Sequence, residues 1–475
     1  MGKTPGPKES DAAKTFKRMT TASVPGLVVR LAIPTILSSL VTALYNTAST
    51  YYVSYLGTSA VGAMGVVFAL QTIIQAVGFM MGQGCAAQTS RLLGAKEYEK
   101  ANRLASSGIF GVLVLASILA VLGLIFIEPL MRIMGATPTI LPYAKAYAEV
   151  VLLAAPFMAA SFSLNNLLRS EGMALLGMIG LGTGGILNIA VSPLFIFTFD
   201  LGIAGAAWAT GLCQTLSFAI LITCLWKGIG SLRFRPAFIA RTPKLYLSIV
   251  QTGMPSLTRN SFGAIAASVL NLAAGQFGDV GVAAMSIVGR VIMITNAGMI
   301  GLGQGYQPVL GYNWGAKLYR RVRTALVSVL SMATALMTVL GVLGFIFAPE
   351  IIGFFETNDP HVLEIGVEAL RYQCIISPLI PVNVIGNMSY QVLGRAAIGT
   401  FLASTRQGIC FLPMILLLPP LLGIRGVELA QPAAETLAFF ICGFFVVHFY
   451  REIRSLIADP GAQRTLPLHG LGKSN

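Results

Sequence analysis

Twelve apolar runs, each long enough to cross a bilayer as a helix, dominate the sequence. An α-helix rises ~1.5 Å per residue, so about 20 apolar residues span the ~30 Å hydrocarbon core. Only 11% of the residues are charged and the mean hydropathy is +0.77, whereas a soluble domain has about 25% charged residues. The sequence therefore excludes a soluble single-domain enzyme and predicts an all-α membrane protein.

The apolar runs fall into two sets of six. Runs of this length indicate helices, because the strands of a membrane barrel are about ten residues long and alternate in polarity. We expect the spans at 27–50, 59–84, 105–127, 142–167, 175–198 and 203–226, then at 246–273, 282–308, 324–347, 362–388, 396–422 and 429–450.

An internal repeat relates the two sets. The segments GQG at 82–84 and GAK at 94–96 recur with the same spacing at 303–305 and 315–317. Each half has an even number of spans, so the repeats are parallel, as in transporters built from two lobes. The predicted organisation is an N-terminal tail (1–23), an N-lobe (24–226), a linker (227–245), a C-lobe (246–452) and a C-terminal tail (453–475).

Lys and Arg gather in alternate connections and give a formal net charge of +14. The positive-inside rule then places both termini in the cytoplasm, with the chain in the plasma (inner) membrane, and explains the charge without nucleic acid. Acidic residues mark the opposite connections: Asp200, Asp279, Glu350, Glu356, Asp359 and Glu364. The six cysteines lack CxxC spacing and the three histidines are scattered, so we expect no metal site and no cofactor.

Several motifs, taken together and in order, resemble the multidrug and toxic compound extrusion (MATE) family, in particular its prokaryotic DinF-like branch. The resemblance covers roughly residues 24–452. The motifs are YNTASTYYV at 45–53, GQGCAAQTSRLLGAK at 82–96, LLRSEG at 167–172, LNIAVSPLFIF at 187–197 with GIAGAAWAT at 202–210, and GLGQGYQPVLGYNWGAK at 301–317. The resemblance implies two six-helix lobes that export organic compounds in exchange for H⁺ or Na⁺.

The resemblance also implies a cation site in the N-lobe, built from an Asp on the first span, an Asn and an Asp on the fifth and a Thr on the sixth. In this chain the Asn is Asn188 and the Thr is Thr210, whereas serines, Ser49 and Ser192, occupy both Asp positions. Serine neither titrates near neutrality nor supplies a charge. We expect a neutral cluster that binds substrate or an ion, or whose members satisfy one another. Its six candidates are Tyr45, Asn46, Ser49, Asn188, Ser192 and Thr210.

Two span acids remain as coupling candidates. Glu149 lies four residues after Lys145, and Glu368 lies three before Arg371, so outer-rim ion pairs are the favoured interpretation and proton carriers the alternative. Because the repeat aligns Glu149 with Arg371, these two residues are also candidates for an outer gate.

The second half carries Arg259, Arg290 and Arg406 within spans, where a buried charge costs at least ~2.5 kcal/mol. If they line a cavity they favour an anionic or zwitterionic substrate, and otherwise they bond backbone carbonyls or lie near span ends. Further cavity candidates are Asn271, Gln304, Gln307, Asn387 and Gln391.

These features predict a secondary active efflux transporter of small organic solutes, working as a monomer by alternating access with H⁺ or Na⁺ antiport. The alternatives are a flippase or exporter of a lipid-linked or anionic substrate, and an exchanger without ion coupling. We expect no enzymatic activity, since no convergent catalytic groups are present.

Overall fold

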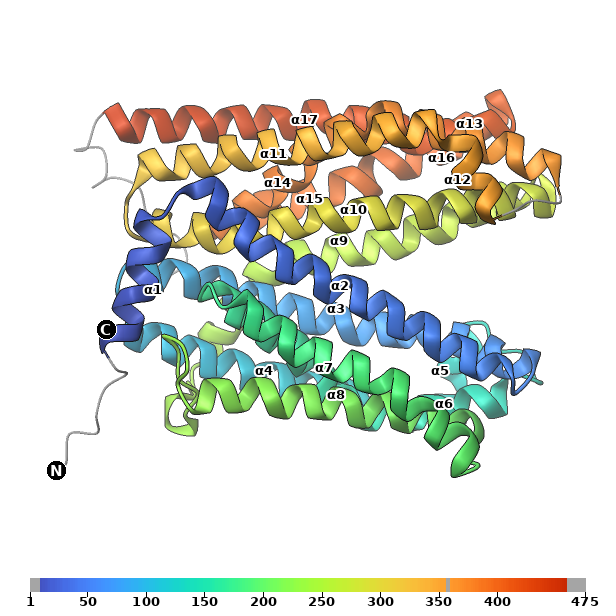
Figure 1. The fold of residues 1–475 in the computed structure, drawn as a ribbon, viewed down its shortest axis with the longest axis horizontal. Coiled ribbons are helices and arrows are strands. Elements are labelled where there is room, and N and C mark those ends of the chain that lie inside the picture. Colours follow the sequence, from blue (N-terminus) through green and yellow to red (C-terminus); the bar gives the residue numbers. More distant parts are fainter. Residues whose placement is uncertain (1–8, 356–358, 459–475) are drawn as a thin grey trace. The chain divides into compact units, whose positions relative to one another are not determined.

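The computed structural model describes residues 9–355 and 359–458, and every secondary-structure element assigned in these ranges is helical (Figure 1). Glu356 and the ends of both predicted tails, 1–8 and 459–475, lie outside the described residues. Ten described helices are long and apolar enough by themselves to cross a bilayer. The more polar α9 and the broken α13–α14 segment complete twelve spans, as predicted.

The first six spans are α2 (Val24–Ser54), α3 (Thr58–Gly94), α4 (Tyr98–Ile125), α6 (Leu141–Ser170), α7 (Ala174–Pro193) with the π-helical turn η1 (Leu194–Thr198), and α8 (Gly202–Trp226). The second six are α9 (Pro243–Gly275), α10 (Gly278–Gly315), α11 (Tyr319–Ile346), α13 (Pro360–Ile376) with η3 (Ser377–Leu379) and α14 (Ile380–Val392), α15 (Ala396–Ser404) with the π-helical turn η4 (Thr405–Cys410) and α16 (Phe411–Leu422), and α17 (Ile424–Ala458). Shorter elements are α1 (Glu9–Thr21), α5 (Ile127–Ile133), η2 (Pro236–Phe238) and α12 (Ala348–Phe355).

The internal repeat is visible in the helix boundaries. Helices α3 and α10 end at the glycines of the two GAK segments, Gly94 and Gly315, and α4 and α11 begin at the equivalent tyrosines, Tyr98 and Tyr319. The lysines that end the GAK segments both have a left-handed backbone, with φ of 60° after α3 and 59° after α10. Such a conformation is uncommon for a residue other than glycine, so its recurrence shows that the two halves share local geometry as well as helix order.

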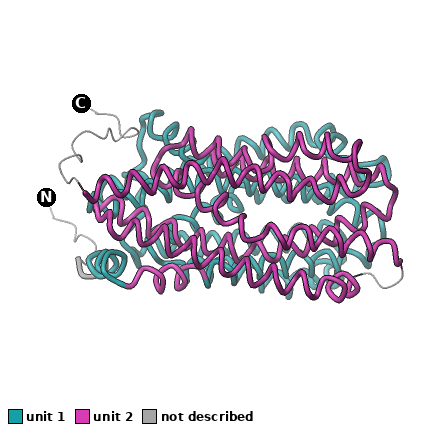
Figure 2. Tube along the Cα trace, turned by 90° about the horizontal axis from the view of Figure 1, so that it is seen from above, with its two compact units in different colours: residues 1–22, 33–253 teal, residues 23–32, 254–475 magenta. Residues whose placement is uncertain are grey.

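The chain divides into two compact units that differ from the predicted lobes (Figure 2). Unit 1 contains the described residues up to Ala22 together with 33–253, and unit 2 contains 23–32 together with the described residues from 254 onward. The first turns of α2 therefore belong to the unit formed by the second half, and the first turns of α9 belong to the unit formed by the first half. The predicted lobe boundaries, 24–226 and 246–452, follow chain order and stay a prediction.

Glycines explain why these first turns pack so closely. A Cβ on Gly84 of α3 would clash with the carbonyl oxygen of Ile249 in α9, inside unit 1. At the equivalent place in unit 2, a Cβ on Gly305 of α10 would lie 2.7 Å from the carbonyl oxygen of Val28 in α2. The two GQG segments thus lie within helices and permit close backbone contact.

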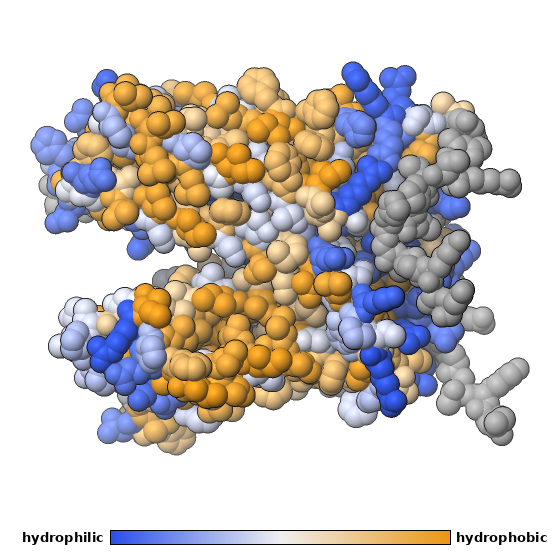
Figure 3. All heavy atoms as spheres, turned by 180° about the vertical axis from the view of Figure 1, so that it is seen from behind, coloured by the Kyte–Doolittle hydropathy of each residue, from blue (hydrophilic) through white to orange (hydrophobic). Residues whose placement is uncertain are grey.

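Apolar side chains cover the middle of the helices, whereas hydrophilic residues gather at the helix ends (Figure 3). Leu421, Ile118 and Phe444 are among the large apolar side chains that remain exposed. Exposure of such residues along most of a helix is unfavourable in water but matches a hydrocarbon environment.

The predicted N-terminal tail contains a packed helix. In α1 the buried residues Ala12, Thr15 and Met19 share one face, as expected from spacings of three and four. The Arg18 guanidinium donates to the carbonyl of Gly172 (2.9 Å), and the Lys96 ammonium lies 4.7 Å from the centre of the Phe16 ring. Helix α1 is therefore bound to the segments that follow α3 and α6.

The predicted linker is docked on unit 1. Glu171, which is fully buried after the end of α6, accepts hydrogen bonds through Oε2 from the backbone N–H groups of Ser231 (2.5 Å) and Leu232 (2.9 Å). Further along, the N–H of Arg233 donates to Asn102 Oδ1 of α4 (2.8 Å). Burial raises the pKa of the Glu171 carboxyl to about 7, and the two N–H donors act in the opposite direction.

Candidate functional site

The predicted N-lobe cluster converges on one side chain, Asn188. Ser49 of α2 donates to Asn188 Oδ1 (2.9 Å), and Ser192, one turn further along α7, donates to the same oxygen (3.3 Å). Asn188 Nδ2 donates to Thr210 Oγ1 of α8 (3.2 Å), which in turn donates to the carbonyl of Ala206 (3.0 Å). All four side chains are buried, so three helices are joined by a closed hydrogen-bond network.

The other two predicted members lie differently. Tyr45 is buried and its hydroxyl accepts a hydrogen bond from Gln214 Nε2 of α8 (3.2 Å). Asn46 is half-buried and lies outside the hydrogen bonds that join Asn188 to its neighbours. Tyr147 of α6 lies against Thr210. Sequence reasoning missed Gln214 and Tyr147, although Gln214 follows Thr210 by one helical turn.

This arrangement determines what the N-lobe cluster can do. Helices α2, α7 and α8 contain no Asp or Glu, so the network holds no group that ionises near neutrality. Asn188 Oδ1 already accepts two hydrogen bonds. The cluster is suited to fixing the packing of three helices and to hydrogen bonding with a solute that displaces one of its members.

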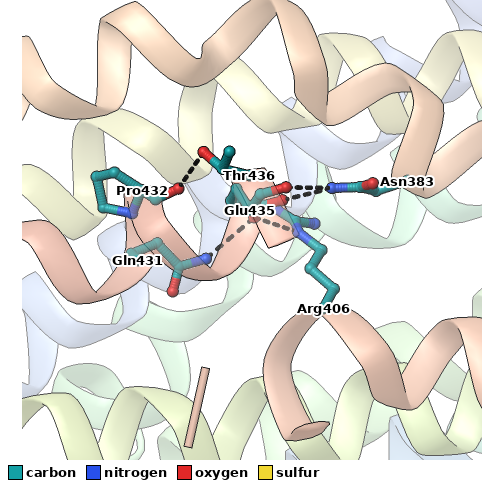
Figure 4. Close-up of polar contacts among 6 residues, drawn as sticks. All are labelled: Asn383, Arg406, Gln431, Pro432, Glu435 and Thr436. Atoms are coloured by element: carbon teal, nitrogen blue, oxygen red, sulfur yellow. Dashed lines mark hydrogen bonds and ion pairs between the residues drawn. The ribbon is translucent and has the colours of Figure 1, made fainter. Parts of the chain in front are cut away.

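A charged cluster lies inside the second half (Figure 4). Glu435 of α17 is 1% exposed and forms an ion pair with the Arg406 guanidinium through Oε1. Its Oε2 accepts a hydrogen bond from Asn383 Nδ2 of α14 (2.9 Å), and Gln431 Nε2 donates to Oε1 (3.0 Å). Every described partner is a donor, which is the arrangement that an ionised carboxylate needs when it is buried.

The backbone around Arg406 departs from a regular helix. Arg406 lies in the π-helical turn η4, between α15 and α16. A π-helical turn inserts one residue into a helix and re-aims the side chains that follow, and such turns are frequent at functional sites. The partner of Arg406 was not identifiable from the sequence, because Glu435 lies on another helix, well beyond the spacing at which neighbours on one helix meet.

The remaining C-half candidates divide into buried and exposed residues. Arg259 Nη1 donates to Asn387 Oδ1 (3.0 Å), and Gln391 Nε2 donates to Ser256 Oγ (2.7 Å). Gln304 and Gln307 are buried in α10, whereas Arg290 and Asn271 are exposed. The structure thus brings Arg259 and Asn387 together and leaves Arg290 apart from them.

The predicted rim ion pairs require correction. Glu368 Oε1 lies 3.6 Å from Arg425 Nε and accepts a hydrogen bond from the Tyr372 hydroxyl (2.5 Å), so its ion-pair partner is Arg425 rather than Arg371. The Arg371 guanidinium instead lies over the Phe345 ring, 5.3 Å from its centre. Glu149 is exposed, and within the described ranges it forms no ion pair with Lys145.

Comparison with known proteins agrees with this architecture. The sequence model of the MatE family matches residues 34–194 and 255–416. The chain is similar to a protein named "Multidrug export protein MepA" from Staphylococcus saprophyticus, with 24% identity over 426 residues, 90% of this chain and 94% of the relative. The protein of the same name from Staphylococcus haemolyticus is 26% identical over 423 residues, covering 88% and 92%.

Solved structures share the fold. An outward-facing multidrug resistance MATE family transporter of the MOP superfamily matches with a TM-score of 0.86 and 24% identity, over 96% of this chain and all of the other. A MOP superfamily transporter from Pyrococcus furiosus, described as having a binding pocket of reverse polarity, matches with the same TM-score and identity over 92% of this chain and 98% of the other.

Proposed function

Since this chain belongs to the MATE family of membrane transporters, which are not enzymes, we propose that it exports small drug-like organic solutes by alternating access in exchange for H⁺ or Na⁺. The proteins named for multidrug export, which align over nine-tenths of the chain, support the substrate class. We further propose a monomer in the plasma membrane with both termini in the cytoplasm.

One observation carries the exchange mechanism: the Glu435–Arg406 pair lies within the membrane part of the second half. Glu435 is eleven residues beyond the start of α17, which corresponds to about 16 Å along the helix. A carboxylate at such depth is expensive to retain and marks ion or substrate pathways. The N-lobe cluster around Asn188, where the family resemblance places the cation site, holds only neutral side chains, so we assign coupling to the second half.

Gradient-driven transport tests this function. The purified protein in liposomes is given a fluorescent organic cation, with a pH gradient and a Na⁺ gradient imposed separately. We expect one of the two gradients to drive accumulation. Absence of accumulation under both gradients would contradict an ion-coupled exporter, and exchange of solute that persists without either gradient would identify the exchanger without ion coupling.

A second candidate, export of an anionic solute, is favoured by Arg259 and Arg290 in the second half. Arg406 is neutralised by Glu435, whereas Arg259 donates to Asn387 and Arg290 is exposed. A fluorescent organic anion in the same liposomes separates the two candidates, because a cavity of fixed polarity cannot favour both dyes equally.

A further inference from the structure

One face of α17 carries a stripe of polar residues, Glu428, Gln431 and Glu435. The Arg406–Glu435 pair involves Glu435 and Gln431 but not Glu428. Glu428, Gln431 and Glu435 are spaced by three and then four residues, so they lie on the same side of the helix. Glu428 is seven residues before Glu435, about 10 Å nearer the beginning of the helix. Gln431, between them, already donates to Glu435.

Glu428 is a buried carboxylate with an acceptor to spare. It is 1% exposed, and within the described residues its Oε2 has no hydrogen-bond partner. The charged groups that act on it are Glu368, Arg425 and Glu364. Burying an ionised carboxylate oxygen without a donor is unfavourable. A cation bound to Oε2 would offset this desolvation cost. The unpartnered oxygen therefore favours a positively charged ligand.

The neighbouring helix α13 connects Glu428 with the surface. Glu364, Glu368 and Tyr372 are spaced by four residues and share one face of α13, and α13 packs against α17. Glu368 is one-third exposed and accepts from the Tyr372 hydroxyl, while Arg425 is 70% exposed. Three carboxylates and one arginine leave this cluster formally negative, which attracts cations from solution.

The acids of the stripe have no counterpart in the first half. The Gly-Ile-x-Gly segments at 202–205 and 423–426 align α8 with α17 at an offset of 221, which also relates the two GQG segments. In both segments the second glycine packs against a backbone carbonyl, Gly205 against Phe195 and Gly426 against Leu418. The positions equivalent to Glu428, Gln431 and Glu435 are then Ala207, Thr210 and Gln214. The acids therefore belong to the second half alone, the half that lacks the Asn188 network. In the N-lobe, serines replace both aspartates that the family resemblance implies. The buried carboxylates of this chain's α17 lie instead in the second half.

We propose that Glu428, with Glu368 and Tyr372 beside it, binds the coupling cation, H⁺ or Na⁺, and that the α17 stripe links this site to the Arg406–Glu435 pair. Binding of H⁺ adds the proton to a Glu428 carboxylate oxygen, and binding of Na⁺ leaves the carboxylate ionised as a ligand. This site rests on the proposed function and deepens it, because it supplies the ion binding that the exchange requires.

The test compares Glu428→Gln with wild type in proteoliposomes, using two assays. Accumulation of the fluorescent cation is measured under a pH gradient and, separately, under a Na⁺ gradient. Exchange of labelled for unlabelled solute is measured without any ion gradient. In Glu428→Gln we expect gradient-driven accumulation of the fluorescent cation to fall at least tenfold. Exchange of labelled for unlabelled solute should persist. The gradient that loses its effect identifies the ion.

Two further variants complete the design. Glu350→Gln, an exposed acid in the first turn of α12, controls for loss of negative charge and should transport like wild type. Tyr372→Phe removes the hydroxyl that bonds Glu368 and should raise several-fold the ion concentration that gives half-maximal drive, even if Glu428→Gln fails to fold. The proposed site is wrong if Glu428→Gln accumulates the cation as well as wild type does. It is also wrong if Tyr372→Phe leaves the ion concentration for half-maximal accumulation unchanged. A wild-type protein that responds to neither gradient instead overturns the proposed function itself.

Discussion

Replacing Glu171 by Gln should remove a pH dependence from the stability of unit 1. Burial raises the pKa of this carboxyl from 4.5 to about 7. Between these pH values the carboxyl is protonated in the folded protein and ionised in the unfolded chain. The folded state then binds more protons, so the free energy of unfolding falls as pH rises from about 4.5 to 7 and is constant above. At ~1.36 kcal/mol per pH unit the fall amounts to about 3 kcal/mol.

Glutamine keeps an acceptor oxygen for the N–H groups of Ser231 and Leu232 but carries no charge to bury. We expect Glu171→Gln to be more stable than wild type at pH 8, by a margin that narrows as the pH falls to 5. Thermal unfolding of the detergent-solubilised protein, followed by tryptophan fluorescence from pH 5 to 8.5, measures both profiles. Glu99→Gln, at an exposed acid of α4, should keep the wild-type slope. Parallel profiles for wild type and Glu171→Gln would refute the assignment of this slope to Glu171.

Two further outcomes are expected. Gly84→Ala should sharply reduce the yield of folded protein in size-exclusion chromatography, whereas Gly65→Ala, where a Cβ meets nothing within 4 Å, should not. Asn188→Ala removes the centre of the N-lobe network and should destabilise the protein by about 1–3 kcal/mol in thermal unfolding; no measurable loss would show that the network adds nothing to stability.

The sequence predicted the parts of this molecule that depend on pattern. Span length, the repeat and the family motifs led to twelve helices, and the resemblance brought Ser49, Asn188 and Thr210 together although they lie on three separate spans. The Arg406–Glu435 pair could not be predicted in the same way. One sequence gives no rotation for each helix about its axis, and a π-helical turn changes that rotation locally.

Other misses have simpler physical causes. Glu428 lies just before the apolar run 429–450 and was excluded by the hydropathy boundary, although the helix begins at Ile424. Its spacing from Glu435 would have indicated a shared face. The partner of Glu368 was predicted from helical spacing alone. In the structure Arg425 of α17, and not Arg371, forms the ion pair with Glu368.

The exchanged first turns of α2 and α9 affect how the chain is synthesised. Val28 leaves the ribosome long before Gly305, against which it packs in unit 2, because six spans lie between α2 and α10 in chain order. Unit 1 likewise stays incomplete until Ile249 and Gly253 have been made. Neither half can reach its final packing before the other half has begun to emerge, so a chain cut between α8 and α9 yields two fragments, each carrying a helix end that belongs to the other. Each compact unit therefore contains segments from both halves of the chain, and its packing is complete only after both have been made.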